Sequence, residues 1–203
     1  MKMAVALVGV SLIAATDPPR LFFSKSFPGS TPAYVEIAVE RNGNACYKEA
    51  ADDDQPIKFQ IGESDTSAIF ALADKLGHFN HPLESPVKVA FMGMKTFRFE
   101  AGAEKQEVKF NYSEDLDAQA LLDWFERISE TEQHLINLQR TIKYDKLGVN
   151  EALLLLQISL EHKRLVAPQQ LLPWLDRVVK NDSYMHMARE RAAGLAEAIR
   201  TAK

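Results

Sequence analysis

The sequence contains one cysteine, Cys46, among 203 residues. A single thiol cannot form a disulfide within the chain, so a disulfide-linked scaffold is excluded. The same count excludes zinc sites built on pairs of cysteines. Beyond the N-terminal segment there is no run of eighteen or more apolar residues, so we expect no internal membrane span.

Glycine clusters and excess positive charge, the two patterns that bind phosphate, are also missing. The nine glycines are scattered and most fall at predicted turns, so the sequence has no glycine-rich phosphate loop. The formal net charge is −4, whereas nucleic-acid binding requires clustered positive charge. We therefore expect no nucleic-acid partner and no cofactor.

No motif of a catalytic or metal site is complete. His78 and His81 lie three residues apart with Glu84 beyond them, but a glycine and a proline bracket them and predict a loop rather than one helical face. Residues 27–30, Phe-Pro-Gly-Ser, lack the Gly-x-Ser-x-Gly spacing of an activated serine. The aspartates at 52–54 lack the alternating spacing of a calcium loop. We predict no catalytic, cofactor-binding or metal-binding residues.

The N-terminus has the pattern of a secretory signal peptide. Lys2 precedes an uncharged stretch, residues 3–15, and the charged, proline-containing segment 17–20 follows it. A basic start, a short apolar run and small residues before the break are typical of such a signal. We expect residues 1–16 to be removed and the protein to be exported, to the periplasm or the extracellular space. The alternative is a buried first strand, residues 4–13, in a cytoplasmic protein.

Short segments between residues 21 and 112 alternate between apolar and polar residues. This alternation predicts antiparallel strands that are covered on one face. The predicted strands cover residues 35–39, 45–47, 57–61, 87–91, 97–99 and 108–112. Asn42 and Gly43 predict a tight hairpin between the first two strands, and a second hairpin is predicted around Gly93. Residues 63–77 switch to helical spacing.

The order of these segments suggests an internal repeat. Residues 55–60 align with residues 106–111 at an offset of 51, and the hairpin glycines Gly43 and Gly93 match at an offset of 50. The helices that follow match at an offset of 52. A two-copy duplication explains this spacing. The alternative is a chance likeness between amphipathic strands.

A long helix is predicted over residues 115–146, which contain neither glycine nor proline. An apolar residue recurs every seven positions along it, at Leu121, Ile128, Leu135 and Ile142. We predict an α+β fold: a mostly antiparallel sheet with two helices on one face, followed by an α-helical C-terminal segment. The α+β domain would cover residues 17–130, and the helical segment, residues 131–203, would be joined to it through the long helix.

The C-terminal segment resembles one HEAT repeat over about residues 168–200. The similarity rests on a helix with an early proline (Leu-Leu-Pro-Trp-Leu, 171–175), a turn bearing aspartate (Val-Lys-Asn-Asp, 179–182), and a helix with arginine and small residues (188–195). Such repeats imply contact with another protein and need stacked neighbours. The alternative is a plain helical bundle that packs on itself.

These observations predict an exported, non-catalytic protein that binds a macromolecule, with another protein as the expected partner. Its binding surface would be the open sheet face or the helical end. By strand parity, that open face carries charges of both signs and the only thiol. The residues assigned to it are Glu36, Glu40, Cys46, Lys48, Lys58, Gln60, Arg98 and Lys109. The alternative function is a hydrolase-like enzyme whose active-site residues are dispersed along the sequence.

Overall fold

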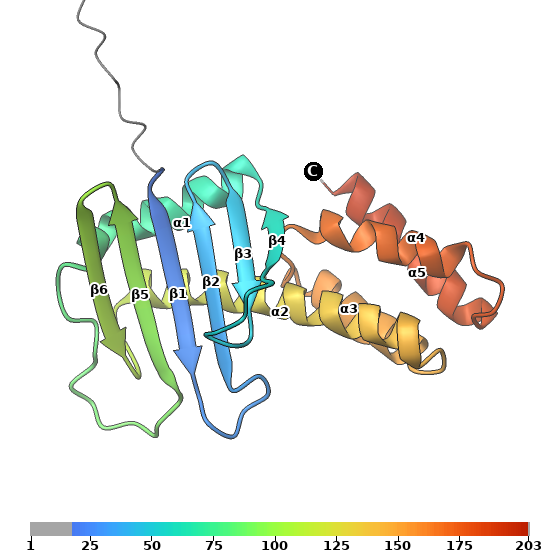
Figure 1. The fold of residues 1–203 in the computed structure, drawn as a ribbon, viewed down its shortest axis with the longest axis horizontal. Coiled ribbons are helices and arrows are strands. Elements are labelled where there is room, and N and C mark those ends of the chain that lie inside the picture. The colour runs from blue at the N-terminus through green and yellow to red at the C-terminus, as the bar shows by residue number, and fades with distance from the viewer. Residues whose placement is uncertain (1–17, 203) are drawn as a thin grey trace, which may run out of the picture.

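The computed structural model describes residues 18–202, and the predicted signal peptide lies outside them. Six strands form one antiparallel sheet in the order β4-β3-β2-β1-β5-β6, and helices α1 and α2 cross one of its faces (Figure 1). The strands are β1 (Arg20–Ser26), β2 (Tyr34–Glu40), β3 (Asn44–Lys48), β4 (Ile57–Gln60), β5 (Met94–Ala101) and β6 (Glu104–Phe110). The two helices are α1 (Glu63–Lys75) and α2 (Leu116–Tyr144).

The chain ends in three α-helices that lie beyond the β4 edge of the sheet (Figure 1). They are α3 (Val149–Glu161), α4 (Leu172–Val179) and α5 (His186–Thr201), and two short 3₁₀ helices, η1 (Gly77–Phe79) and η2 (Pro168–Leu171), occur in the connections. The predicted α+β class, with a helical C-terminal part, is confirmed. Among the described residues, no helix combines the length and the apolar composition that a membrane span needs.

Helix α2 begins where its sequence provides a cap. The Asp115 carboxylate accepts hydrogen bonds from the backbone N–H groups of Asp117, at 2.8 Å, and Ala118, at 3.0 Å. These donors have no partner inside the helix, so the cap stabilises the first turn. The helix then continues for 29 residues without a break. The prediction of one long helix is confirmed.

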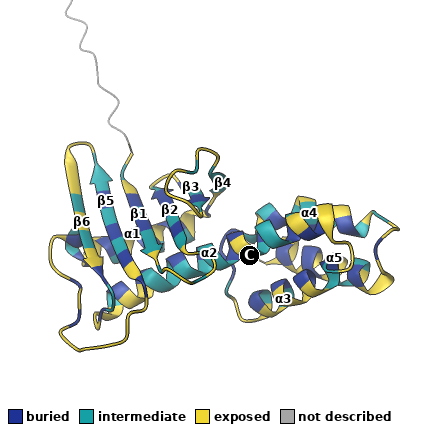
Figure 2. Cartoon of the chain, turned by 60° about the horizontal axis from the view of Figure 1, so that its bottom comes forward, coloured by how far each residue is buried: buried dark blue, intermediate teal, exposed yellow. Residues whose placement is uncertain are grey.

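The first core lies between the sheet and the two helices. The inner faces of β1 and β5 contribute Phe23 and Phe97, and the ring of Phe125 on α2 stacks on Phe23 at a centroid distance of 4.9 Å. Buried positions alternate with more exposed ones along the central strands (Figure 2). The tight turn at Gly43 is confirmed: its φ is +86°, and a Cβ there would lie 2.5 Å from the backbone oxygen of Ile61.

A second core forms among the C-terminal helices. It includes Leu138 of α2, Leu153 of α3, Leu175 of α4 and Leu195 of α5. Helix α2 therefore belongs to both cores. The last sheet-facing residue of α2 that is fully buried in the first core is Ile128, and the second core begins at Leu135.

Two details of the predicted sheet are wrong. Residues 87–91 form no strand but part of an irregular loop between η1 and β5. The position beside β5 is occupied by β1, which pairs with it over all seven of its residues. The strand, hairpin, strand and helix of the proposed repeat therefore do not recur in the predicted order, and the duplication itself stays a prediction. The second hairpin, predicted around Gly93, is wrong for the same reason: Gly93 ends the loop before β5 and does not join two strands.

We expect Phe110→Ala to lower the free energy of unfolding by about 3–5 kcal/mol, because Phe110 is 1% exposed and its loss leaves a cavity. Lys109 is the matched control: it lies next to Phe110 in β6, points to the other face, and its side chain is 63% exposed. Lys109→Ala should cost less than about 0.5 kcal/mol. Chemical denaturation of the two variants checks this, and equal losses would contradict the strand register.

Candidate functional site

The residues considered for a metal site are held apart by other contacts. The ring of His78 stacks on Phe99 at a centroid distance of 3.9 Å and lies 3.0 Å from a carboxylate oxygen of Asp74. The nearby Glu84 carboxylate instead accepts the backbone N–H of Asn111. Within residues 18–202, no group of three or more histidine, cysteine, aspartate or glutamate side chains is placed to hold a metal ion.

The open face of the sheet carries paired charges around small side chains. Arg20 lies 2.7 Å from Glu40, and Lys48 lies 3.0 Å from Glu36. Between them a hollow of about 520 Å³ forms over Ala38 and Cys46. The thiol is partly exposed on this face, as its parity predicts. Since most of the surrounding charges already have partners, this face offers few free groups to a ligand.

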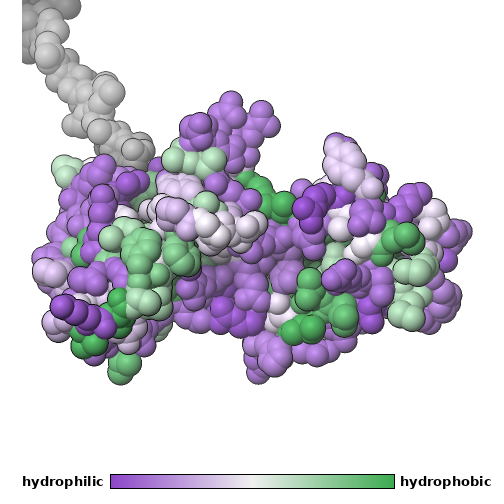
Figure 3. Space-filling model, turned by 90° about the horizontal axis from the view of Figure 1, so that it is seen from below, coloured by the Kyte–Doolittle hydropathy of each residue, from purple (hydrophilic) through white to green (hydrophobic). Residues whose placement is uncertain are grey.

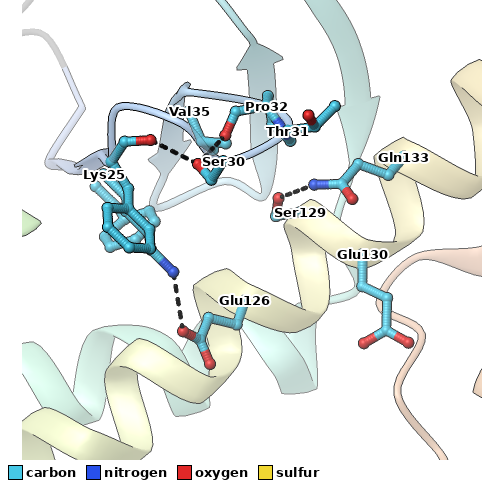
Figure 4. Close-up of a pocket in the computed structure, with 11 residues that line it drawn as sticks. Lys25, Ser30, Thr31, Pro32, Val35, Glu126, Ser129, Glu130 and Gln133 are labelled. Carbon is cyan, nitrogen blue, oxygen red and sulfur yellow. Dashed lines mark hydrogen bonds and ion pairs between the residues drawn. The ribbon is translucent and has the colours of Figure 1, made fainter. Parts of the chain in front are cut away.

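Lys25 and Glu126 lie between two hollows on the helix-covered side of the sheet and line both of them. The Lys25 ammonium lies 3.8 Å from a carboxylate oxygen of Glu126, which is beyond hydrogen-bond distance. Figure 4 shows the two side chains reaching toward each other across the first hollow, the Ser30 cavity, of about 250 Å³. The second hollow, the Lys95 cavity, measures about 280 Å³ and is also lined by Lys25 and Glu126.

Lys95 is a buried cation in the wall of the Lys95 cavity. It is 4% exposed, and its ammonium donates to three backbone carbonyls: Asn111 at 2.7 Å, Gly93 at 3.1 Å and Met92 at 3.4 Å. Among the described residues, no carboxylate lies within 4 Å of it. Burial, and then the positive charge of Lys25, lower the pKa of Lys95.

Three polar residues with the chemistry of a hydrolase meet between α2 and α3. The Ser159 hydroxyl donates to the Glu130 carboxylate at 2.5 Å, and a ring nitrogen of His134 lies 2.8 Å from the same hydroxyl oxygen. A hydroxyl has one proton, so His134 must be the donor in the second bond. In a nucleophilic triad the histidine accepts the serine proton. The observed chain instead joins two helices, and Arg164 extends it by donating to Glu130 at 3.1 Å.

Glu132 is fully buried where α2 leaves the sheet. One of its carboxylate oxygens accepts from Gln170 at 2.6 Å, and the other has no partner. Burial raises the pKa of Glu132 to about 7, and the hydrogen bond from Gln170 lowers it by a smaller amount. Glu132 is 0% exposed and lines none of the described hollows, so we interpret it as a buried group at the joint between the two cores rather than as a binding residue.

Eight of the exposed large apolar side chains fall in two groups on one side of the molecule (Figure 3), whereas Leu116, Tyr144, Leu147, Met185 and Met187 are exposed elsewhere. The first group is the loop before β5 and the start of that strand, and the second is one side of α3. Their members are Val87, Val89, Phe91, Met92 and Met94 in the first, and Leu154, Leu155 and Ile158 in the second. Soluble proteins seldom expose contiguous apolar patches without a function.

The two groups belong to one continuous surface. Phe91 contacts Phe27 edge to face, with the ring centroids 5.8 Å apart, and Phe27 lines the Ser30 cavity. That cavity shares Thr31 and Pro32 with a third hollow, of about 540 Å³, which Leu155 and Ile158 also line. We call this strip, from the β5 loop through residues 27–32 to α3, the loop-to-helix surface.

Sequence reasoning missed the residues that form these sites, although some left a signal. Lys25 and Lys95 stand at alternation positions otherwise occupied by apolar residues, and Glu132 interrupts the apolar stripe of α2. Contacts between distant segments, such as Glu130 with Ser159, leave no such signal. No protein-family model matches the sequence, and no curated protein matches it either.

We expect the ionisation of Glu132 to lower the free energy of unfolding as the pH rises from about 4.5 to about 7. The folded protein keeps a proton there that the unfolded chain releases, so ionisation opposes folding across this window. A shift of this size corresponds to about 3 kcal/mol at most. Glu132→Gln removes the titration, so its stability relative to wild type should rise by up to this amount across the window. Urea denaturation at several pH values measures it.

The matched control for this prediction is Glu151→Gln, which changes an exposed carboxyl on α3. Surface substitutions have small effects, so its stability relative to wild type should stay nearly constant with pH. A flat difference for Glu132→Gln as well would contradict the buried position of Glu132.

Proposed function

We propose that the protein is an exported, non-catalytic binding protein that holds another protein on its loop-to-helix surface. The observation that supports this most strongly is the exposure of the two apolar groups along one continuous strip. Phe91 is 54% exposed and Leu155 is 46% exposed. Burying such a side chain completely contributes about 1.5–3 kcal/mol, so a few of them provide an affinity that polar contacts alone seldom reach.

The arrangement of the strip also suits a protein partner. Protein interfaces place apolar anchors at the centre and polar side chains around them. Here a polar band lies between the two apolar groups and includes Gln133, Asn137 and Arg140 of α2. Arg140 is held in place by a hydrogen bond of 3.0 Å to Asn137. A flat partner can therefore rest on the polar band while its own apolar residues meet both groups.

The resemblance of residues 168–200 to a HEAT repeat supports the same proposal. Helices α4 and α5 pack on each other, with Leu175 and Ala192 in their shared core. The hydrolase alternative is less well supported, because the hydroxyl of Ser159, the serine in contact with His134, directs its proton to Glu130 rather than to the histidine.

Substituting one exposed residue in each apolar group should weaken partner binding. We expect Phe91→Ser and Leu155→Ser each to raise the Kd by about fourfold to tenfold, because binding buries only the exposed half of each side chain, worth about 0.8–1.5 kcal/mol. The measurement begins with affinity capture of the tagged protein from its native cells. The captured partner is then titrated against each purified variant.

The matched control is Lys58→Ser, which changes the open face of the sheet and leaves the loop-to-helix surface intact. Its Kd should equal that of the wild type. If Lys58→Ser alone lost the partner, the binding surface would be the open sheet face instead.

Export predicts that the mature protein begins after the uncharged N-terminal stretch, near residue 17. N-terminal sequencing of protein purified from its native cells, combined with cell fractionation, checks this. A chain that still begins at Met1 or Lys2 would place the protein in the cytoplasm and remove export from the proposal.

A further inference from the structure

On the inner face of the sheet, β1 and β5 carry a pair of lysines where the other inner-facing residues of these two strands are apolar. Lys25 of β1 and Lys95 of β5 are directly opposite each other in the strand register. They follow the same parity as Phe23 and Phe97, which are buried in the first core. Like charges in directly opposed positions destabilise a sheet. Something in the surroundings should therefore offset this repulsion.

The protein supplies only part of the negative charge that these lysines need. Glu126 is the one carboxylate that lines the Lys95 cavity within the described residues, and it lies 3.8 Å from Lys25 without a hydrogen bond. Glu84 is nearby, but its carboxylate accepts the backbone N–H of Asn111 and does not line the cavity. The cavity wall holds two ammonium groups and one carboxylate, and Glu84 attracts Lys95 only from outside this wall. Within residues 18–202 the buried Lys95 ammonium is therefore without a contacting counter-ion, which is unfavourable.

The Lys95 ammonium uses all three of its donors on backbone carbonyls, but one of these bonds is weak enough for an anion to replace it. The longest of the three Lys95 bonds, 3.4 Å to the Met92 carbonyl, is the weakest, and both residues line the cavity. The Lys25 ammonium has no hydrogen bond to Glu126, and its side chain is 32% exposed. A carboxylate between the two lysines would accept from both at once.

The remainder of the cavity is suited to an apolar group. Its walls include the buried residues Phe110 and Ala118 and the partly buried Leu122. Its volume of about 280 Å³ is at the small end of the range for ligand pockets, so the occupant must be small. We propose that the Lys95 cavity binds an apolar chain or ring that ends in one carboxylate, with the carboxylate on Lys25 and Lys95 and the apolar part against Phe110 and Leu122.

This chemistry has two possible sources, a free aliphatic acid and the C-terminal residue of a protein. The probes are therefore octanoate and N-acetyl-leucine, and octanamide serves as the uncharged control. Isothermal titration calorimetry with the full-length mature protein measures each Kd. We expect octanoate or N-acetyl-leucine to bind with one-to-one stoichiometry and octanamide to bind at least about tenfold more weakly. The tighter of the two acids identifies the source.

Variants locate the binding. Lys25→Met removes one cation at the cavity mouth and should weaken the acid about tenfold or more, without changing octanamide. Leu122→Trp fills the apolar end and should weaken all three probes. Lys58→Met removes a lysine from the open face of the sheet and should change nothing. Lys95→Met is informative only if circular dichroism shows that it folds, so Lys25→Met and Leu122→Trp carry the test.

Two results would overturn the inference. One is the absence of saturable binding by either acid. The other is acid binding that is unchanged in both Lys25→Met and Leu122→Trp. Neither result bears on the loop-to-helix surface, since the Phe91 and Leu155 variants test that proposal separately.

Discussion

The packing of Phe125 on Phe23 fixes the orientation of α2 on the sheet, and with it the place where the C-terminal helices pack. This stacked pair, with ring centroids 4.9 Å apart, holds the first half of α2 against the sheet. Because α2 continues without a break to Tyr144, the second half projects beyond the edge of the sheet and becomes a wall of the second core. Arg164 strengthens the joint, since it donates to Asp123 at 2.6 Å and to Glu130 at 3.1 Å. The helical end is therefore joined to the sheet mainly through α2, and Val166 and Ala167, which follow α3, add contacts with the first core.

Sequence patterns identified the elements that depend on local periodicity. Apolar residues repeated every seven positions predicted α2, and alternation predicted five of the six strands and the face on which Cys46 lies. The failure at residues 87–91 has a physical cause. Alternation shows that a segment can form a strand, but not whether an unpaired neighbour is available to it. Here β1 pairs with the edge of β5 that residues 87–91 would have needed. Asn111 holds those residues in a loop through hydrogen bonds to Ala90 and Met92.

The candidate sites were less accessible to sequence reasoning because they depend on pairing between distant segments. Lys25 and Lys95 each interrupt an apolar alternation, which marks them as unusual, but only the register of β1 and β5 places them opposite each other. The chain from Glu130 through Ser159 to His134 depends on how α3 folds back on α2. The composition excludes a disulfide within the chain and zinc sites built on pairs of cysteines, but it cannot show contacts that form only in three dimensions.

The strand order has a consequence for how the chain folds. β1 is the first strand of residues 18–202, yet it lies at the centre of the sheet between β2 and β5. One of its edges is paired early by its neighbour β2, whereas the other waits until β5, beyond α1 and a long loop, has been made. Until then the half-formed sheet presents an unpaired edge along Leu21 and Phe23, and such edges recruit other chains. Pairing between distant strands is also slow. Aggregation of nascent or truncated chains is thus a hazard that lasts until β5 is added.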